Sequence, residues 1–247
     1  MKIARLFAAL ALLSISPVLL IAQISPEALS VIERYNRITG GAESKRNITS
    51  IIYEGTWDMP EREIFGPATI YIQDGEIFGL FLEIPDVGTI KNCFAHGKAW
   101  VENPFMGTQG LQGTEFEQMG KSSVIFPEIA MDRIYAYAQI QEHRDPNLTK
   151  LLLKDKNGEE ETWWFDPRTG LLSEIQSVMD AGVQGSFIIS LKYGNYQPFG
   201  DLLLAHTFTW HTPAYEVEIR VTNIRINAEI PVHLFQPPTE ASEADLY

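Results

Sequence analysis

The residues able to perform acid, base or metal chemistry are few and scattered. The five histidines are His96, His143, His206, His211 and His233. His206 and His211 are the closest pair, but an odd spacing in an extended strand places them on opposite faces. A metal ion needs several ligands converging on one point. The sequence therefore predicts no metal site and indicates that these histidines are ordinary core or surface residues.

A nucleophile, a base and an orienting group cannot be assembled from this sequence. The motifs Gly-x-Ser-x-Gly and His-Glu-x-x-His are absent, and the glycines do not form a phosphate-binding loop. The three carboxylates of Glu159–Glu161 follow Asn157-Gly158, which indicates a solvated turn rather than an acid/base pair. The single cysteine, Cys93, excludes an internal disulfide or a zinc ribbon and is interpreted as a small buried hydrophobic residue. We expect no catalytic residue, no metal and no cofactor.

Bulky apolar side chains are the distinctive feature of the segments that look like strands. In Glu76–Ile84 both alternating sets of residues are largely apolar, and a strand of that kind must bury both faces. One face can pack on a helix and the other can line an apolar cavity. The residues predicted to bind a ligand in such a cavity are Phe78, Leu80, Leu82, Trp100, Leu204, Phe208 and Trp210. The alternative is a solid core without a cavity, and a one-residue slip in register would turn each strand over.

Most of the chain after Ile48 alternates in polarity with a period of two, as strands do. Turn pairs such as Asp74-Gly75 separate the alternating segments. No strand–helix–strand alternation occurs, which favours an antiparallel sheet. About ten or eleven strands are expected, within Ile51–Asp58, Pro67–Gln73, Glu76–Ile84, Gly88–Ala95, Lys98–Glu102, Leu148–Lys154, Glu160–Phe165, Leu171–Met179, Ser186–Tyr193, Leu203–Thr212 and Tyr215–Thr222.

Helices are expected in fewer places. Ser25 is a good N-cap, Pro26 suits the first helical position, and apolar residues recur at helical spacing, so a helix is predicted over Pro26–Thr39. Asn103–Gly113 is expected to be a loop, followed by a short helix over Thr114–Met119 capped by Thr114. Phe126–Ile140 is ambiguous, although Pro127-Glu128 could start a helix.

The first residues indicate export. Lys2 and Arg5 precede the apolar stretch Leu6–Ile21, which Pro17 interrupts, and this layout is typical of a secretory signal rather than of a membrane anchor. Cleavage is expected after Ala22, with Gln23 as the other option. The predicted organisation is a signal peptide over residues 1–22 and a single domain over residues 23–247. The alternative is an uncleaved anchor.

Charge and composition limit the classes of partner. The formal net charge is −13, which disfavours nucleic acid and anionic lipid surfaces. Hydrophobic residues make up 45% of the chain and charged residues 21%, as in a folded globular protein. No cysteine lies near Ala22, so a lipid cannot be attached there, and the mature protein is expected to be soluble.

Several segments resemble the bacterial outer-membrane lipoprotein-sorting family, the LolA/LppX-like group of periplasmic carriers. The resembling segments are Ala28–Gly41, Gly88–Ile90, His96–Trp100, Trp163–Leu172, Ile230–Pro231 and Phe235–Pro238, in the family's order. The resemblance implies a mainly β (α+β) fold: a curved antiparallel sheet forming an incomplete barrel, covered by an N-terminal helix and one or two short helices. It also implies an apolar cavity for acyl chains.

The function expected from the residues and the resemblance together is a non-catalytic periplasmic carrier or binding protein for a lipoprotein, lipid or other apolar ligand. The partners expected are a lipid or a lipidated protein, with an inner-membrane transporter or an outer-membrane receptor as candidate proteins, and no nucleic acid. The alternative is an envelope interaction or sensor module that uses the same half-barrel to bind a protein or a peptide.

Overall fold

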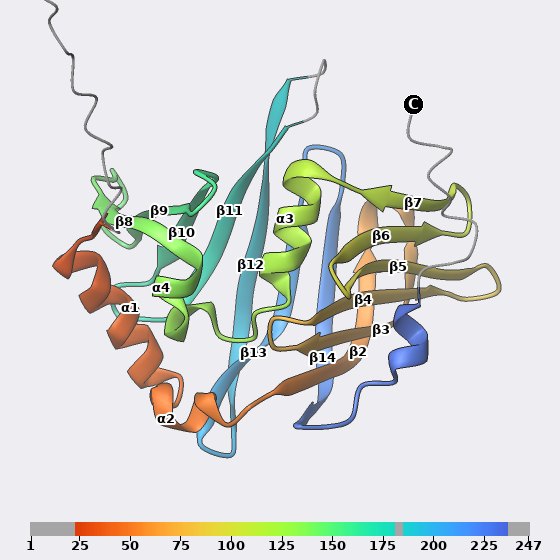
Figure 1. The fold of residues 1–247 in the computed structure, drawn as a ribbon, viewed down its shortest axis with the longest axis horizontal. Helices are drawn as coiled ribbons and strands as arrows, with labels where there is room; N and C mark the ends of the chain where they lie inside the picture. The colour runs from red at the N-terminus through yellow and green to blue at the C-terminus, as the bar shows by residue number, and fades with distance from the viewer. Residues whose placement is uncertain (1–22, 181–184, 237–247) are drawn as a thin grey trace, which may run out of the picture.

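One curved, open sheet dominates the molecule. The computed structural model describes residues 23–180 and 185–236, and the predicted signal peptide lies outside this range. The described strands form a single fourteen-stranded sheet that does not close on itself (Figure 1). The strands are β1 (Gln23–Ile24), β2 (Ser50–Met59), β3 (Ile64–Gln73), β4 (Ile77–Ile84), β5 (Gly88–Ala95), β6 (Lys98–Asn103), β7 (Gly107–Leu111), β8 (Tyr135–Gln141), β9 (Thr149–Asp155), β10 (Glu160–Phe165), β11 (Leu172–Asp180), β12 (Ser186–Phe199), β13 (Leu202–His211) and β14 (Glu216–Ile226).

The helices are short, and most of them lie on one side of the sheet (Figure 1). The first of them follows β1 directly, and the last comes at the end of the described chain. They are α1 (Pro26–Ile38), α2 (Gly41–Arg46), η1 (Pro60–Arg62), α3 (Gly113–Ser122), η2 (Pro127–Ile129), α4 (Met131–Ile134) and η4 (Val232–Phe235).

The sheet consists of two meanders joined by one late strand. Strands β2 to β7 pair in sequence order, and so do β8 to β13, while β14 pairs antiparallel with both β13 and β2. All described pairs are antiparallel except β1 with β8, which is parallel. The expectation of a curved, incomplete barrel is therefore confirmed, with a mixed sheet in place of a purely antiparallel one.

The eleven expected strands are present, and the structure adds three. Strand β7 lies inside the segment expected to be a loop. The ambiguous segment contains the short helices η2 and α4 and ends in strand β8. The prediction missed β7 because Gly107–Leu111 lacks apolar alternation and contains two glycines. The third addition, β1, has only two residues, which is too short for any periodicity to show.

The N-termini of α1 and α3 test the two predicted helix caps. In α1 the hydroxyl of Ser25 accepts a hydrogen bond from the backbone N–H of Ala28 at 3.1 Å, as expected for an N-cap. In α3 the predicted cap, Thr114, was wrong: the helix starts one residue earlier, at Gly113, and Gln112 occupies the cap position without a side-chain hydrogen bond. The positive φ of Gly113 lets the chain turn into the helix before Thr114.

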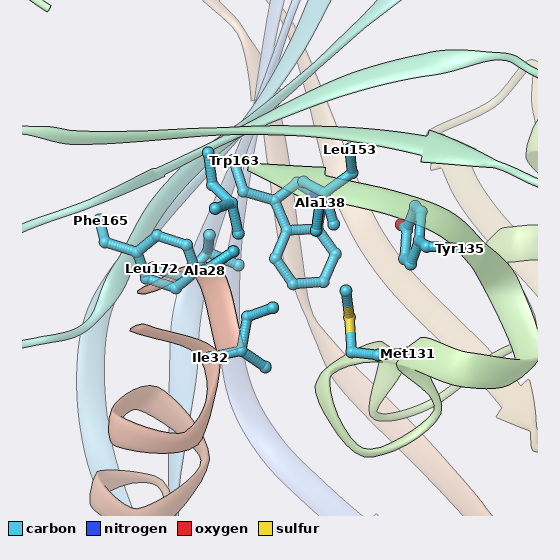
Figure 2. Packing of buried hydrophobic residues seen from close by; sticks show 10 residues of the cluster. Ala28, Ile32, Met131, Tyr135, Ala138, Leu153, Trp163, Phe165 and Leu172 are labelled. Atoms are coloured by element: carbon cyan, nitrogen blue, oxygen red, sulfur yellow. The ribbon is translucent and has the colours of Figure 1, made fainter. Parts of the chain in front are cut away.

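Each face of the sheet is covered by different elements. We call the face carrying α1 and α3 the inner face and the opposite face the outer face. On the inner face, Ala28 and Ile32 of α1 pack on β8–β11, where Trp163 and Phe165 are fully buried (Figure 2). On the outer face, Phe235 of η4 covers Trp100 and Cys93. Both faces of one sheet are therefore apolar in places, as the two-sided strands predicted.

The cover on the outer face depends on a glycine. A Cβ at Gly79 would lie 2.5 Å from the ring of Phe235, so only glycine allows the ring to rest on β4. The ring centroid of Phe235 lies 5.7 Å from that of Tyr71 and 5.6 Å from that of Phe81. The residue itself has no exposed surface. The C-terminal turn is thus an integral part of the core.

We predict that Phe235→Ala lowers the free energy of unfolding by about 3–5 kcal/mol, because it removes a fully buried ring and leaves a cavity. Urea denaturation of the purified protein measures this. Val232→Ala, in the same short helix but half exposed, is the matched control and should change little. A loss at Phe235 no larger than that at Val232 would show that η4 is not a structural cover.

Candidate functional site

A row of apolar residues crosses the inner face from Trp163 on β10 to Val217 on β14. Cross-strand pairs join Trp163 to Ile175, Ile175 to Leu191, and Leu191 to Trp210. Trp210 in turn pairs with Val217. Directly opposed residues share a face of the sheet, so this row is continuous across five strands. Trp163 and Val217 at its ends are buried, whereas the three residues between them are only half-buried.

A second inner row runs beside the first and is aromatic. Tyr193 pairs with Phe208, Phe208 with Ile219, and Ile219 with Trp57. The ring centroid of Phe208 lies 5.8 Å from that of Tyr193 and 5.5 Å from that of Tyr53, both in edge-to-face geometry. Phe208 thus lies near the middle of the inner face, on β13, the last strand of the second meander.

Most of the residues predicted to bind a ligand come together. Phe78, Leu80, Leu82, Phe208 and Trp210 belong to one cluster around Trp57. Leu204 lies in the adjoining cluster, which also touches Phe208.

Trp100 is the exception. It pairs with Cys93, which pairs with Gly79, and all three lie on the outer face under Phe235. The sequence grouped Trp100 with the others because an aromatic residue in a strand shows no sign of which face it occupies. Its indole nitrogen is buried there without a hydrogen-bond partner among the described residues.

Two half-buried tyrosines lie in the middle of the inner face, on either side of Phe208. Burial raises the pKa of Tyr53 and of Tyr193 far above the usual value of 10.0. Both residues nevertheless keep part of their surface accessible to solvent. Both side chains therefore lie largely among protein atoms while keeping some contact with solvent. These tyrosines were not among the predicted site residues, although Tyr53 alternates in phase with Trp57 and could have been found by that signal.

Helix α3 lies over the inner face and is anchored on both sides. It contacts β4, β5, β6 and β11 (Figure 1). On one side the ring of Phe116 packs on Phe94 with centroids 5.7 Å apart. On the other, Lys121 Nζ lies 3.1 Å from Asp155 Oδ2 and 2.6 Å from Glu161 Oε1. The helix therefore covers part of the apolar inner face.

A buried ion pair fixes the other helices. Lys45 Nζ lies 2.5 Å from Glu128 Oε1 and donates to Asn36 Oδ1 at 3.0 Å and to Thr39 Oγ1 at 2.6 Å. Lys45 is 1% exposed, and burial lowers its pKa despite the adjacent carboxylate. The pair links α2 to the end of α1 and to η2. Sequence reasoning missed it because a lysine in a short polar helix usually points to solvent.

Other kinds of site find no support in the described residues. Across 23–180 and 185–236, no group of three His, Cys, Asp or Glu side chains could hold a metal ion. No helix in the same ranges is long and apolar enough to cross a membrane. Two hollows, of about 560 and 350 Å³, are lined by Tyr137 and Leu152 and by Phe126 and Arg133 among others, and neither contains any of the seven predicted residues.

Comparison with known proteins identifies the fold. No protein-family model matches the sequence, and no curated protein matches it. Among solved structures, a DUF1329 family protein from Desulfovibrio piger matches with a TM-score of 0.53 and 12% identity, over 85% of this chain and 97% of that one. A LolA superfamily protein from Nitrosomonas europaea gives a TM-score of 0.51 at 11% identity, over 85% and 97%.

A third structure completes the comparison. The putative outer membrane lipoprotein-sorting protein domain from Vibrio parahaemolyticus gives a TM-score of 0.50 at 13% identity, over 85% of this chain and 96% of that one. The protein is therefore an open half-barrel of the type found in these structures. The resemblance inferred from the sequence is confirmed at the level of the fold, which is what identities this low can show.

We predict that Lys45→Met lowers the free energy of unfolding by about 3–5 kcal/mol, because Glu128 is left as a buried charge without its cation. The double variant Lys45→Met/Glu128→Leu should recover much of the loss. Lys154→Met is the control, since its pair with Glu160 is exposed. Equal effects of Lys45→Met and Lys154→Met in urea denaturation would contradict a structural role for the buried pair.

We also predict that stability falls as the pH rises above about 10. Burial raises the folded-state pKa of Tyr35, Tyr53, Tyr135, Tyr193 and Tyr196 above the unfolded value of 10.0. Their contribution is fully present below the unfolded pKa and is lost as the pH rises toward the folded values. Melting temperatures measured alongside tyrosinate absorbance test this. Tyrosines that all ionise near their ordinary pKa without unfolding would refute the buried cluster.

Proposed function

We propose that this protein is a non-catalytic periplasmic carrier or binding protein for a lipoprotein, a lipid or another apolar ligand. The observation that supports this best is the continuous apolar inner face, whose middle residues Ile175, Leu191 and Trp210 remain half-buried. A folded protein gains by burying such side chains, and a ligand's acyl chain can do so. Ligand chains would lie on this face beneath α1 and α3.

The energetics suit a single acyl chain. Each methylene group removed from water contributes about 0.8 kcal/mol, so about ten of them would contribute about 8 kcal/mol. That corresponds to a Kd on the order of micromolar before the costs of association are subtracted. Because those costs amount to several kcal/mol, the net affinity for one chain is weaker than micromolar, which allows release as well as capture.

Cargo and location are part of the same proposal. The lipoprotein-sorting description of the similar Vibrio domain supports a lipid or lipidated protein as cargo. The signal-like sequence before Gln23 supports export to the periplasm. An inner-membrane transporter or an outer-membrane receptor would then supply or accept the cargo.

A second candidate is an interaction or sensor module that binds an envelope protein or a peptide. Exposed apolar side chains at one end of the sheet favour it: Val87 lies in the β4–β5 turn, and Phe105 and Met106 lie in the β6–β7 turn. The two turns touch, since a Cβ at Gly88 would lie 3.0 Å from Pro104. Such a surface suits a protein partner. This exposed surface favours the interaction module over the carrier only if the inner face takes up no lipid.

We predict that the wild-type protein, purified from its own host, carries lipid detectable by native mass spectrometry and takes up a fluorescent fatty acid. Leu191→Asn should weaken uptake about tenfold, because it places an amide against the ligand's chain. Ile188→Asn is the matched control, since Ile188 lies on the same strand but is exposed on the outer face. Thermal unfolding of both variants checks that they fold.

The same measurements also distinguish an inner face that is open to ligand from a solid core. Leu80 is only 5% exposed, so Leu80→Asn should lower stability by about 1–3 kcal/mol through an unpaired buried amide. Absence of lipid and of uptake in the wild type, together with this loss at Leu80, would reject the carrier and leave the interaction module.

A further inference from the structure

The hydroxyls of Tyr53 and Tyr193 lie in the middle of the apolar inner face, with no hydrogen-bond partner among the described residues. Tyr53 and Tyr193 flank Phe208 from opposite sides, since they come from β2 and β12. Neither hydroxyl forms a hydrogen bond with another described residue, and neither is closed off from solvent. Neighbouring tyrosines differ: Tyr196 donates to the carbonyl of Leu172 at 2.8 Å, and Tyr135 donates to Glu161 at 2.7 Å. The apolar inner face therefore presents two hydroxyl groups that are available to bond to a ligand.

The charges around these hydroxyls restrict the ligand. Burial is the main cause of the raised pKa of both tyrosines; Glu128 raises the pKa of Tyr53 further, and Glu161 and Glu128 raise that of Tyr193 further. Each of these carboxylates is paired with a lysine, Glu128 with Lys45 and Glu161 with Lys121. A further anion would meet these carboxylates in a poorly solvated place. Both phenols stay protonated near neutral pH, so they remain hydrogen-bond donors. An uncharged acceptor fits these conditions best.

We propose that the hydroxyls of Tyr53 and Tyr193 form a polar subsite for the uncharged carbonyl of an acyl ester or amide, whose chain lies on the apolar inner face beside Phe208. The inference rests on the proposed function, because it names the part of the amphiphile that the inner face recognises. It explains why polar groups occur in the middle of an otherwise apolar face: a hydrogen bond from either hydroxyl would hold the ligand's carbonyl beside Phe208.

Displacement of the apolar dye N-phenylnaphthylamine from the full chain tests the subsite. The competitors share one chain length: methyl laurate, lauramide, dodecane and, above neutral pH, the laurate anion. Tyr53→Phe and Tyr193→Phe should each weaken the ester and the amide about three- to tenfold, as expected for one hydrogen bond. Dodecane affinity should not change, and the laurate anion should gain nothing from either hydroxyl.

Controls keep the result specific. Tyr71→Phe removes a hydroxyl from the outer face, where Tyr71 packs on Phe81 and Phe235, and should alter no affinity. Tyrosine-to-phenylalanine changes conserve shape, and melting temperatures confirm folding.

The outcomes separate the two proposals. Failure of the dye and of every competitor to bind would overturn the proposed function and the subsite with it. Binding of all competitors with no loss in either phenylalanine variant, or equal losses for dodecane and the ester, would overturn the subsite alone. Stronger dependence of the laurate anion than of the ester on the two hydroxyls would likewise overturn it, because the subsite would then select a charged group.

Discussion

A single open sheet has two faces to cover, and this requirement governs the rest of the structure. Strands such as β4 are apolar on both sides, so neither face can be left entirely to water. The inner face receives α1 at one end and α3 over the middle, while the C-terminal turn with Phe235 covers part of the outer face. The ion pair of Lys45 with Glu128 links helix α2 to helix η2. Elements far apart in the sequence thus cover the two faces of the same sheet.

Cover of the inner face is incomplete. The end clusters are buried, whereas the rows between them are only half-buried. Side chains in these rows pack against their neighbours on the sheet and are only partly covered by helices. In the proposed function, this apolar surface is where a ligand would bind, and packing it solidly would remove the site. The tyrosines add polarity at the same place without adding charge.

Local chemistry made much of the fold predictable. Turn pairs such as Asp74-Gly75, the Ser25 cap and the alternation of eleven strands all depend on near neighbours in sequence. Strand β7 escaped because its stability comes from pairing with β6 and not from its own residues. Alternation showed that Phe78 shares a face of its strand with Leu80, and Phe208 with Trp210, but which faces of different strands coincide depends on register, and for that reason Trp100 was grouped with residues of the opposite face. The burial of Lys45 could not be foreseen, since its partner Glu128 lies far along the chain.

The position of β14 has a consequence for how the chain folds. Each meander is built from adjacent hairpins, which form quickly because their contacts are local. The middle of the sheet is different: β14 must pair with β2, bringing Ile219 beside Trp57 across most of the described sequence. The hairpin of β13 with β14 is itself local, so only the pairing of β14 with β2 joins the two meanders over a long sequence separation. We expect that pairing to form after the local hairpins, and until it forms the edges of β2 and β14 would be open to pairing with another chain.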